Sequence, residues 1–177
     1  MHRLFVAIRP PRPVRDRLLG AMGGIAGARW QTDDQLHITL RFIGEVDSRQ
    51  AEDVDLALRR VRFAPFDIAV KGVGSFERRG QPTALWAGVE PAEPLHALHK
   101  KVDQACVQAG LEPERRAYRP HITLARLRAS ARSAGALFTA AGDLSCEAFP
   151  VDQFGLYESV LTPDGAVYSL VERYALD

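Results

Sequence analysis

Two histidines of this chain stand in the same tetrapeptide, His-Ile-Thr-Leu, once at His37 to Leu40 and again at His121 to Leu124. The sequence contains only five histidines, so the repeat involves a scarce residue type. An imidazole exchanges its proton near neutral pH, and a hydroxyl can donate a hydrogen bond to a phosphate oxygen. Two imidazoles on either side of one substrate could therefore perform acid–base catalysis, one as proton donor and the other as proton acceptor.

An extended strand would place the polar residues of each motif on one face. Residues i and i+2 of a strand point to the same side of its sheet. His37 and Thr39 would then share a face, as would His121 and Thr123, with the isoleucine and leucine of each motif turned to the core. Two such strands facing each other would suit a phosphodiester, since hydroxyl donors can stabilise the charge that develops at phosphorus.

Each motif also has a less specific explanation. A single strand histidine is more often hydrogen-bonded within a sheet than catalytic, and only the matched pair reverses that expectation. A metal site is a second alternative. However, neither motif histidine is followed two residues later by Asp, Glu or Cys, and His96 and His99 lie on another segment. The sequence also lacks a nucleophile-elbow motif for a catalytic serine. We therefore expect neither a metal nor a cofactor.

The composition is that of an ordinary globular protein, with 46% hydrophobic and 25% charged residues. A formal net charge of +1 argues against binding long duplex nucleic acid, which needs a strongly basic face, but it leaves RNA ends and small cyclic nucleotides as partners. Cys106 and Cys146 have no metal-ligand spacing and no disulfide framework. The apolar residues 4–8 are too few for a signal peptide, and no run approaches the ~18 apolar residues of a membrane span. We expect a cytoplasmic monomer that does not bind membranes.

Hydrophobic periodicity predicts an α+β fold. The expected strands are residues 4–8, 36–43, 66–76, 84–89, 118–127, 143–157 and 166–175, and the expected helices are 11–26, 47–61 (with Asp47 as N-cap) and 94–109. No linker divides the chain, and each half contains one His-x-Thr strand. We therefore expect a single domain over residues 1–177, built of two pseudo-symmetric lobes. Each lobe would be an antiparallel sheet with helices packed outside, and the two motif strands would line the cleft between the lobes.

The residues around the motifs resemble those of the two-histidine (2H) phosphoesterase superfamily, which has two His-x-Thr/Ser motifs about half a domain apart. The resemblance is strongest to the RNA 2′,3′-cyclic phosphodiesterases, historically called 2′-5′ RNA ligases. It covers nearly the whole chain. The segments that carry it are residues 3–10, 37–46, 72–76, 85–89, 118–126 and 157–174, with Trp30 before the first motif.

This resemblance implies a hydrolase that opens RNA 2′,3′-cyclic phosphate ends to 2′-phosphomonoesters without metal, and it leaves reversible 2′-5′ RNA ligation open as an additional reaction. It makes His37 the proton donor and His121 the proton acceptor, with Thr39 and Thr123 binding the phosphate. The alternative is a non-catalytic nucleotide-binding module that uses the same cleft.

The resemblance also implies that Arg126 binds phosphate, but strict alternation places it on the face opposite His121. Either a bulge turns the strand after Leu124, or Arg126 acts from the rim.

Candidates for stacking on a base are Tyr118, Phe42 and Trp30. Core packing is the alternative for each, and alternation favours it for Phe42, which it places with Leu40 and opposite Arg41. Core packing is also favoured for Trp86. Three arginines before the second motif could guide a phosphate backbone or lie on a solvated face: Arg115, Arg116 and Arg119.

Overall fold

The computed structural model describes residues 1–128 and 143–177. In chain order its elements are β1 (His2–Ile8), α1 (Arg12–Gly20), β2 (Ala28–Trp30), the 3-10 helix η1 (Asp33–Gln35), β3 (Ile38–Val46), α2 (Ser48–Leu58), β4 (Phe66–Arg78), β5 (Gln81–Glu90), α3 (Glu93–Gln108), β6 (His121–Leu127), β7 (Phe149–Val151), β8 (Gln153–Thr162) and β9 (Gly165–Ala175). The paired strands of this part of the chain are antiparallel, and the predicted α+β fold class is confirmed.

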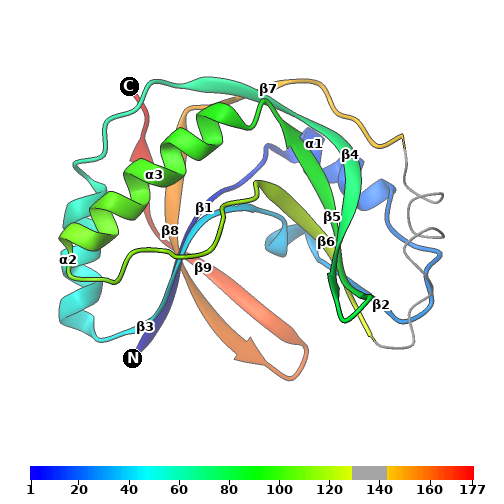
Figure 1. Cartoon of the computed structure of the whole chain (residues 1–177), viewed down its shortest axis with the longest axis horizontal. Coiled ribbons are helices and arrows are strands. Elements are labelled where there is room, and N and C mark those ends of the chain that lie inside the picture. Colours follow the sequence, from blue (N-terminus) through cyan, green and yellow to red (C-terminus); the bar gives the residue numbers. More distant parts are fainter. Residues whose placement is uncertain (129–142) are drawn as a thin grey trace.

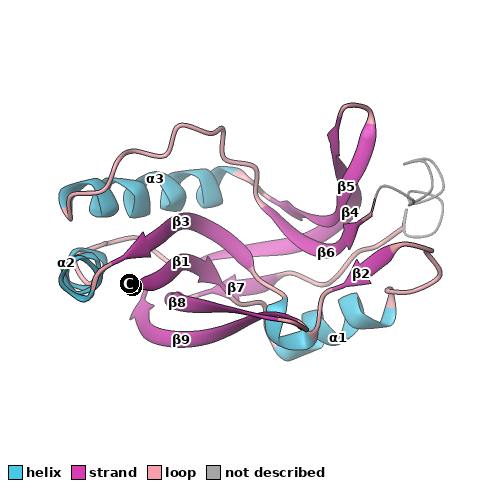
Figure 2. Cartoon of the chain, turned by 90° about the horizontal axis from the view of Figure 1, so that it is seen from below, coloured by secondary structure: helices cyan, strands magenta, loops and turns pink. Residues whose placement is uncertain are grey.

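All the described strands belong to one curled sheet, with the order β7-β4-β5-β6-β3-β1-β8-β9 and with β2 added beside β6. The two predicted lobes are the two arms of this sheet, which meet where β3 pairs with β6. Figure 1 shows α2 and α3 beside the arm that contains β1, β3, β8 and β9, with α1 on the other side of the molecule. In the view of Figure 2 the hairpin β4–β5 rises from the other arm. The two motif strands are therefore central in the sheet.

One hydrophobic core connects the two arms. Strand β1 contributes an uninterrupted buried run, Leu4 to Ile8, because it lies between β3 and β8 and is covered on both faces. Helix α3 adds a buried stripe at helical spacing that includes Leu95, Leu98 and Val102. The motif strands thus rest on a densely packed layer, which holds their backbones in place.

Three local details differ from the sequence pattern. Helix α1 ends at Gly20 rather than near residue 26, and the following Gly23 and Gly24 have positive φ angles that a helix does not allow. The strand expected over residues 143–157 is divided into β7 and the first half of β8, because β7 pairs with β4 whereas β8 pairs with β1. Strand β2 was not expected, since its three residues carry no periodic signal. The predicted N-cap is present, with the Gln50 amide donating to Asp47 at 2.8 Å.

The contact between Gly74 and Trp86 gives a test of the β4–β5 arm. These residues are cross-strand partners, and a Cβ at position 74 would lie 2.2 Å from a ring carbon of Trp86. We therefore expect Gly74→Ala to lower the free energy of unfolding by about 1–3 kcal/mol, measured by urea denaturation. Gly20→Ala in α1 is the control, because nothing lies within 4 Å of its added Cβ. Equal stability of the two variants would show that the indole does not cover Gly74.

Candidate active site

The two His-Ile-Thr-Leu motifs meet at the junction of β3 and β6. Ile38 and Ile122 are cross-strand partners there, and both side chains are completely buried. Since successive side chains of a strand alternate between faces, the histidine and threonine of each motif leave the sheet on the opposite face. The antiparallel register sets His37 across from Thr123, and Thr39 across from His121. The four polar groups predicted from the repeat therefore gather on one surface.

Both motif histidines have the same ring nitrogen fixed by a main-chain carbonyl. Nδ1 of His37 lies 2.7 Å from the carbonyl oxygen of Gln35, and Nδ1 of His121 lies 2.6 Å from that of Arg119. A carbonyl oxygen only accepts, so Nδ1 must carry the hydrogen in each ring. The other nitrogen is then the one available for proton transfer. In His37 this Nε2 lies 2.9 Å from the Thr39 hydroxyl, which donates to it when the ring is neutral.

A β-bulge in β6 brings Arg126 to the face of His121. Thr123 and Ala125 lie opposite consecutive residues of β5, so Leu124 is the additional residue. Leu124 and Ala125 are both buried, after which alternation resumes with Arg126 exposed. The sequence left two explanations open for Arg126, a bulge in the strand or a place at the rim, and the structure contains the bulge.

Strand β3 contains a bulge at the equivalent position of its motif. Thr39 and Arg41 lie opposite consecutive residues of β1, so Leu40 is additional. Arg41 is consequently buried with Leu40, at 7% exposure, and Phe42 is turned outward with 58% of its surface exposed. The preference for core packing of Phe42, and the placement of Arg41 beside His37, were therefore wrong, because both assumed strict alternation. The two strands present matching triplets: His37, Thr39 and Phe42, and His121, Thr123 and Arg126.

A cleft of ≈ 860 Å³ opens beside His37 and is rich in positive charge. Its lining includes four arginines against one acidic residue, Glu114; the arginines are Arg3, Arg29, Arg116 and Arg126. The whole chain has a formal charge of only +1, so cationic groups are concentrated here. Phe42 and Tyr168 give the cleft apolar surface as well. Such a lining suits an anion that carries a flat ring.

Aromatic rings flank each motif histidine, and most of them carry no local signal in the sequence. The centroid of His37 lies 5.0 Å from Phe5 and 5.3 Å from Tyr168. His121 has Phe76 edge-on at 4.8 Å and Trp86 at 6.1 Å. Phe76 and Tyr168 come from hairpins far from the motifs in sequence, so only the folded sheet reveals them.

Burial shifts the titration of both imidazoles. Desolvation lowers the pKa of His37 from 6.5 to about 4, and the nearby charges of His121, Arg9 and Arg126 act in the same direction. Desolvation also lowers the pKa of His121; the hydrogen bond to the Arg119 carbonyl opposes this shift, and the charge of Arg126 adds to it. Both rings are therefore neutral at pH 7 in the free protein, and an anion in the cleft would favour protonation of one of them.

The two remaining stacking candidates, Tyr118 and Trp30, are not among the residues that line this cleft. Tyr118 has its ring stacked on His99 and its hydroxyl bonded to the main chain, so neither is directed to a base in the cleft. Trp30 packs partly buried against the core, next to Ala125 of β6. Of the three arginines before the second motif, Arg116 lines the cleft.

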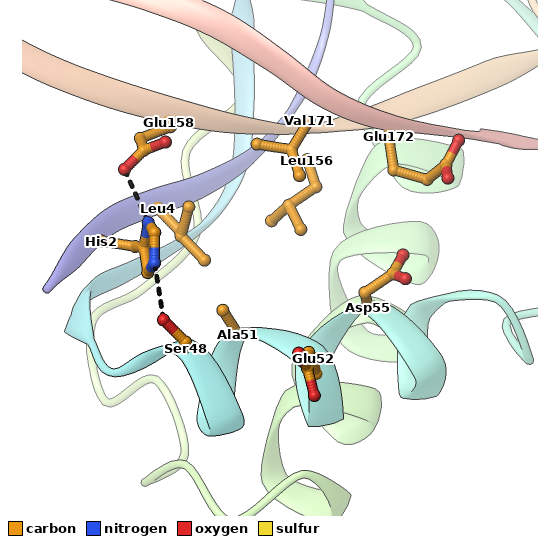
Figure 3. Close-up of a pocket in the computed structure, with 10 residues that line it drawn as sticks. All are labelled: His2, Leu4, Ser48, Ala51, Glu52, Asp55, Leu156, Glu158, Val171 and Glu172. Atoms are coloured by element: carbon orange, nitrogen blue, oxygen red, sulfur yellow. Dashed lines mark hydrogen bonds and ion pairs between the residues drawn. The ribbon is translucent and has the colours of Figure 1, made fainter.

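A second hollow lies between α2 and the strands β1, β8 and β9 (Figure 3). His2 bridges Glu158 and Ser48 at its edge, with contacts of 2.9 and 3.1 Å. Its lining includes neither motif histidine nor any arginine, and four of its residues are acidic, so it does not suit a phosphate. Among the described residues, no cluster of three or more His, Cys, Asp and Glu side chains could hold a metal ion. No helix in this part of the chain is long and apolar enough to cross a membrane.

The antiparallel α+β fold and the pairing of the two His-x-Thr strands, which sets their polar side chains on one surface, define a two-histidine phosphoesterase. The model of the 2′-5′ RNA ligase superfamily matches residues 12–162, and the chain belongs to this superfamily. The resemblance recognised in the sequence is confirmed.

Relatives and solved structures agree with this assignment. An RNA 2′,3′-cyclic phosphodiesterase of Archaeoglobus fulgidus is 30% identical over 169 residues, which cover 94% of this chain and 96% of the relative. Another, of Thermus thermophilus, is 34% identical over 188 residues, covering 98% and 90%. Crystal structures of TT0787 of Thermus thermophilus and of E. coli LigT complexed with 3′-AMP give TM-scores of 0.81 and 0.80 at 28% and 26% identity. They cover 98% and 99% of this chain, and 97% and 98% of their own chains.

Proton titration tests the electrostatics of the cleft. In the free protein we expect the His37 ring to titrate near pH 4, followed by NMR of its Cε1 proton. Inorganic phosphate should raise this pKa, because an adjacent anion favours the imidazolium. In the unfolded chain the His37 ring has its ordinary, higher pKa and binds a proton more readily than in the folded protein. The free energy of unfolding should therefore fall as the pH drops from 6.5 toward 4, and it should fall less in His37→Gln. A free-protein pKa at or above 6.5 would contradict the burial of this ring.

Proposed function

We propose that this protein hydrolyses RNA 2′,3′-cyclic phosphate ends to 2′-phosphomonoesters without a metal ion. The observation that carries the proposal is the pairing of the motif strands, which gathers two imidazoles and two threonine hydroxyls beside an arginine-rich cleft. Family membership and the names of the relatives support 2′,3′-cyclic phosphodiesterase activity.

In the proposed reaction, water attacks phosphorus while the bond from phosphorus to the 3′ oxygen breaks. His121 accepts the proton from water, and His37 protonates the departing 3′ oxygen. Both protons pass through Nε2, since Nδ1 of each ring is bonded to a carbonyl. With a 5′-hydroxyl in place of water, the same steps form a 2′-5′ linkage, so RNA ligation is the corresponding transfer reaction.

Thr39, Thr123 and Arg126 are proposed to hold the phosphate oxygens. Arg126 supplies a positive charge, which stabilises the pentacoordinate transition state most. Because His37 is neutral in the free protein, substrate binding must also supply the negative charge that raises its pKa and makes it a proton donor. Phe42 is the proposed platform for a base, since it is exposed and lines the cleft.

A nucleotide-binding module without turnover is the alternative, and the names of the relatives favour the enzyme. Calorimetry with a mononucleotide, run beside a turnover assay, separates the two functions. Binding without any product would support the module.

Hydrolysis of a short RNA with a 2′,3′-cyclic phosphate end tests the reaction directly. We expect a 2′-phosphate product in the presence of EDTA. His37→Ala and His121→Ala should each lower kcat by about 10²–10⁴, since each loses one proton-transfer group. His2→Ala is the control, because this strand histidine lies outside the cleft. Activity that is lost in EDTA and restored by a divalent metal would overturn the metal-independent mechanism.

The bulge in β6 predicts a specific role for Arg126. Arg126→Met should lower kcat at least about tenfold through loss of a charged phosphate contact. It should also raise the pKa of His37 measured by NMR, because the Arg126 charge opposes protonation of that ring. Arg128→Met removes the same charge two residues further along and is the control, since Arg128 is not among the residues that line the cleft. If both variants behaved like wild type, Arg126 would not contact the substrate.

A further inference from the structure

The two bulges have equivalent positions in their motifs, but different groups donate hydrogen bonds to their main-chain carbonyls. A bulge interrupts the ladder of hydrogen bonds and leaves carbonyl groups that need other donors. In β6 the main chain around β2 supplies a donor, since the Gln31 amide bonds to the Leu124 carbonyl at 2.8 Å. Strand β2 then continues along β6, pairing Trp30 with Ala125 and Arg29 with Arg126. The second motif is thus held by a neighbouring strand.

On the corresponding edge of β3, side chains donate these hydrogen bonds. Among the described residues, β3 pairs with β6 only at Ile38. The Tyr118 hydroxyl donates to the carbonyl of Thr39 at 2.9 Å, and Nδ1 of His99 donates to that of Leu40 at 2.5 Å. These two carbonyls belong to the bulge itself. The first motif is therefore held by a phenol and an imidazole instead of a strand.

Tyr118 and His99 also hold each other. Their rings are stacked with centroids 4.2 Å apart and an interplanar angle of 3°. His99 is fixed on α3 between buried Leu98 and Val102. Desolvation raises the pKa of Tyr118, so its hydroxyl remains a neutral donor. The stacked pair is a rigid support anchored in the core.

Tyr118 further connects the two motifs. It precedes His121 by three residues, and the intervening Arg119 carbonyl binds the His121 ring. One short segment therefore fixes the backbone of Thr39 at one end and the orientation of His121 at the other.

We propose that Tyr118 and His99 are positioning residues, which hold the β3 bulge and thereby set Thr39 and Phe42 relative to the two histidines. Both side chains bind main-chain carbonyls of β3, so they act through its backbone. The proposal rests on the proposed function for its kinetic consequences, and on the hydrogen bonds alone for its structural ones.

Tyr118→Phe tests the proposal because it removes the donor and keeps the ring. We expect kcat on the cyclic-phosphate RNA to fall by about 10–100-fold, since a small misplacement of reacting groups has effects of this size, with a smaller change in KM. Tyr174→Phe is the matched control. The buried Tyr174 also donates its hydroxyl, to Asp55 at 2.7 Å, but it lies on β9 next to α2. This control should lose similar thermal stability and keep kcat within about twofold.

Two substitutions of His99 provide a rescue. His99→Phe keeps a ring against Tyr118 but removes the donor to Leu40, whereas His99→Gln retains an N–H donor. We expect kcat to be higher in His99→Gln than in His99→Phe.

Hydrogen exchange at the amides of residues 40–42 gives a readout that needs no turnover. Exchange there should be faster in Tyr118→Phe than in Tyr174→Phe. If the wild-type protein fails to open the RNA, the proposed function is wrong. The exchange measurement still tests whether Tyr118 holds the β3 bulge, because it needs no turnover. Equal exchange in the two variants, or a loss of kcat that merely follows thermal stability, would overturn the proposal.

Discussion

The pairing of Ile38 with Ile122 is the constraint on which the site depends, because it is the registered contact between the two motif strands. Both isoleucines are fully buried, so the register is set by the core. A slip of one residue would turn the isoleucines to the cleft and the histidines into the core. The arms of the sheet extend away from this junction, with α2 and α3 beside one arm and α1 on the other side of the molecule (Figures 1 and 2).

The bulge in β3 also places a guanidinium in the core, and the fold compensates for it. Arg41 is bonded to Asp103 of α3 at 2.6 Å and to the carbonyls of Phe42 and Glu112. A buried charge is tolerated only when it is paired and its donors are satisfied. Asp103 in turn accepts from the Glu114 amide at 3.1 Å, which fixes the segment that brings Glu114 and Arg116 to the cleft. Arg41 thus links the first motif to the segment that supplies Glu114 and Arg116 to the cleft.

The sequence was sufficient for features that repeat locally. Alternation identified the motif strands and their polar faces, and helical spacing identified α3 within a residue or two. It failed at Phe42 and Arg41, and left Arg126 open, because a bulge has no pattern of its own. A bulge is stable only when its carbonyls find donors, and these donors come from residues distant in sequence. Gln31 donates to the bulge in β6, and Tyr118 donates to the bulge in β3. The aromatic neighbours of the histidines were missed for the same reason, since separate hairpins supply them.

The outward-facing residues of the two motifs first differ two positions after the additional leucine of each bulge, and this difference gives a bound substrate a direction. Phe42 and Arg126 occupy equivalent places, one apolar and exposed, the other cationic. A nucleotide has the same two parts, a flat base and an anionic phosphate. In the proposed complex the phosphate lies toward Arg126 and the base toward Phe42, so two nearly identical strands bind one asymmetric molecule in a single orientation. In that complex the same asymmetry separates the proposed roles of the two histidines, because His37 then faces the departing 3′ oxygen and His121 the attacking water.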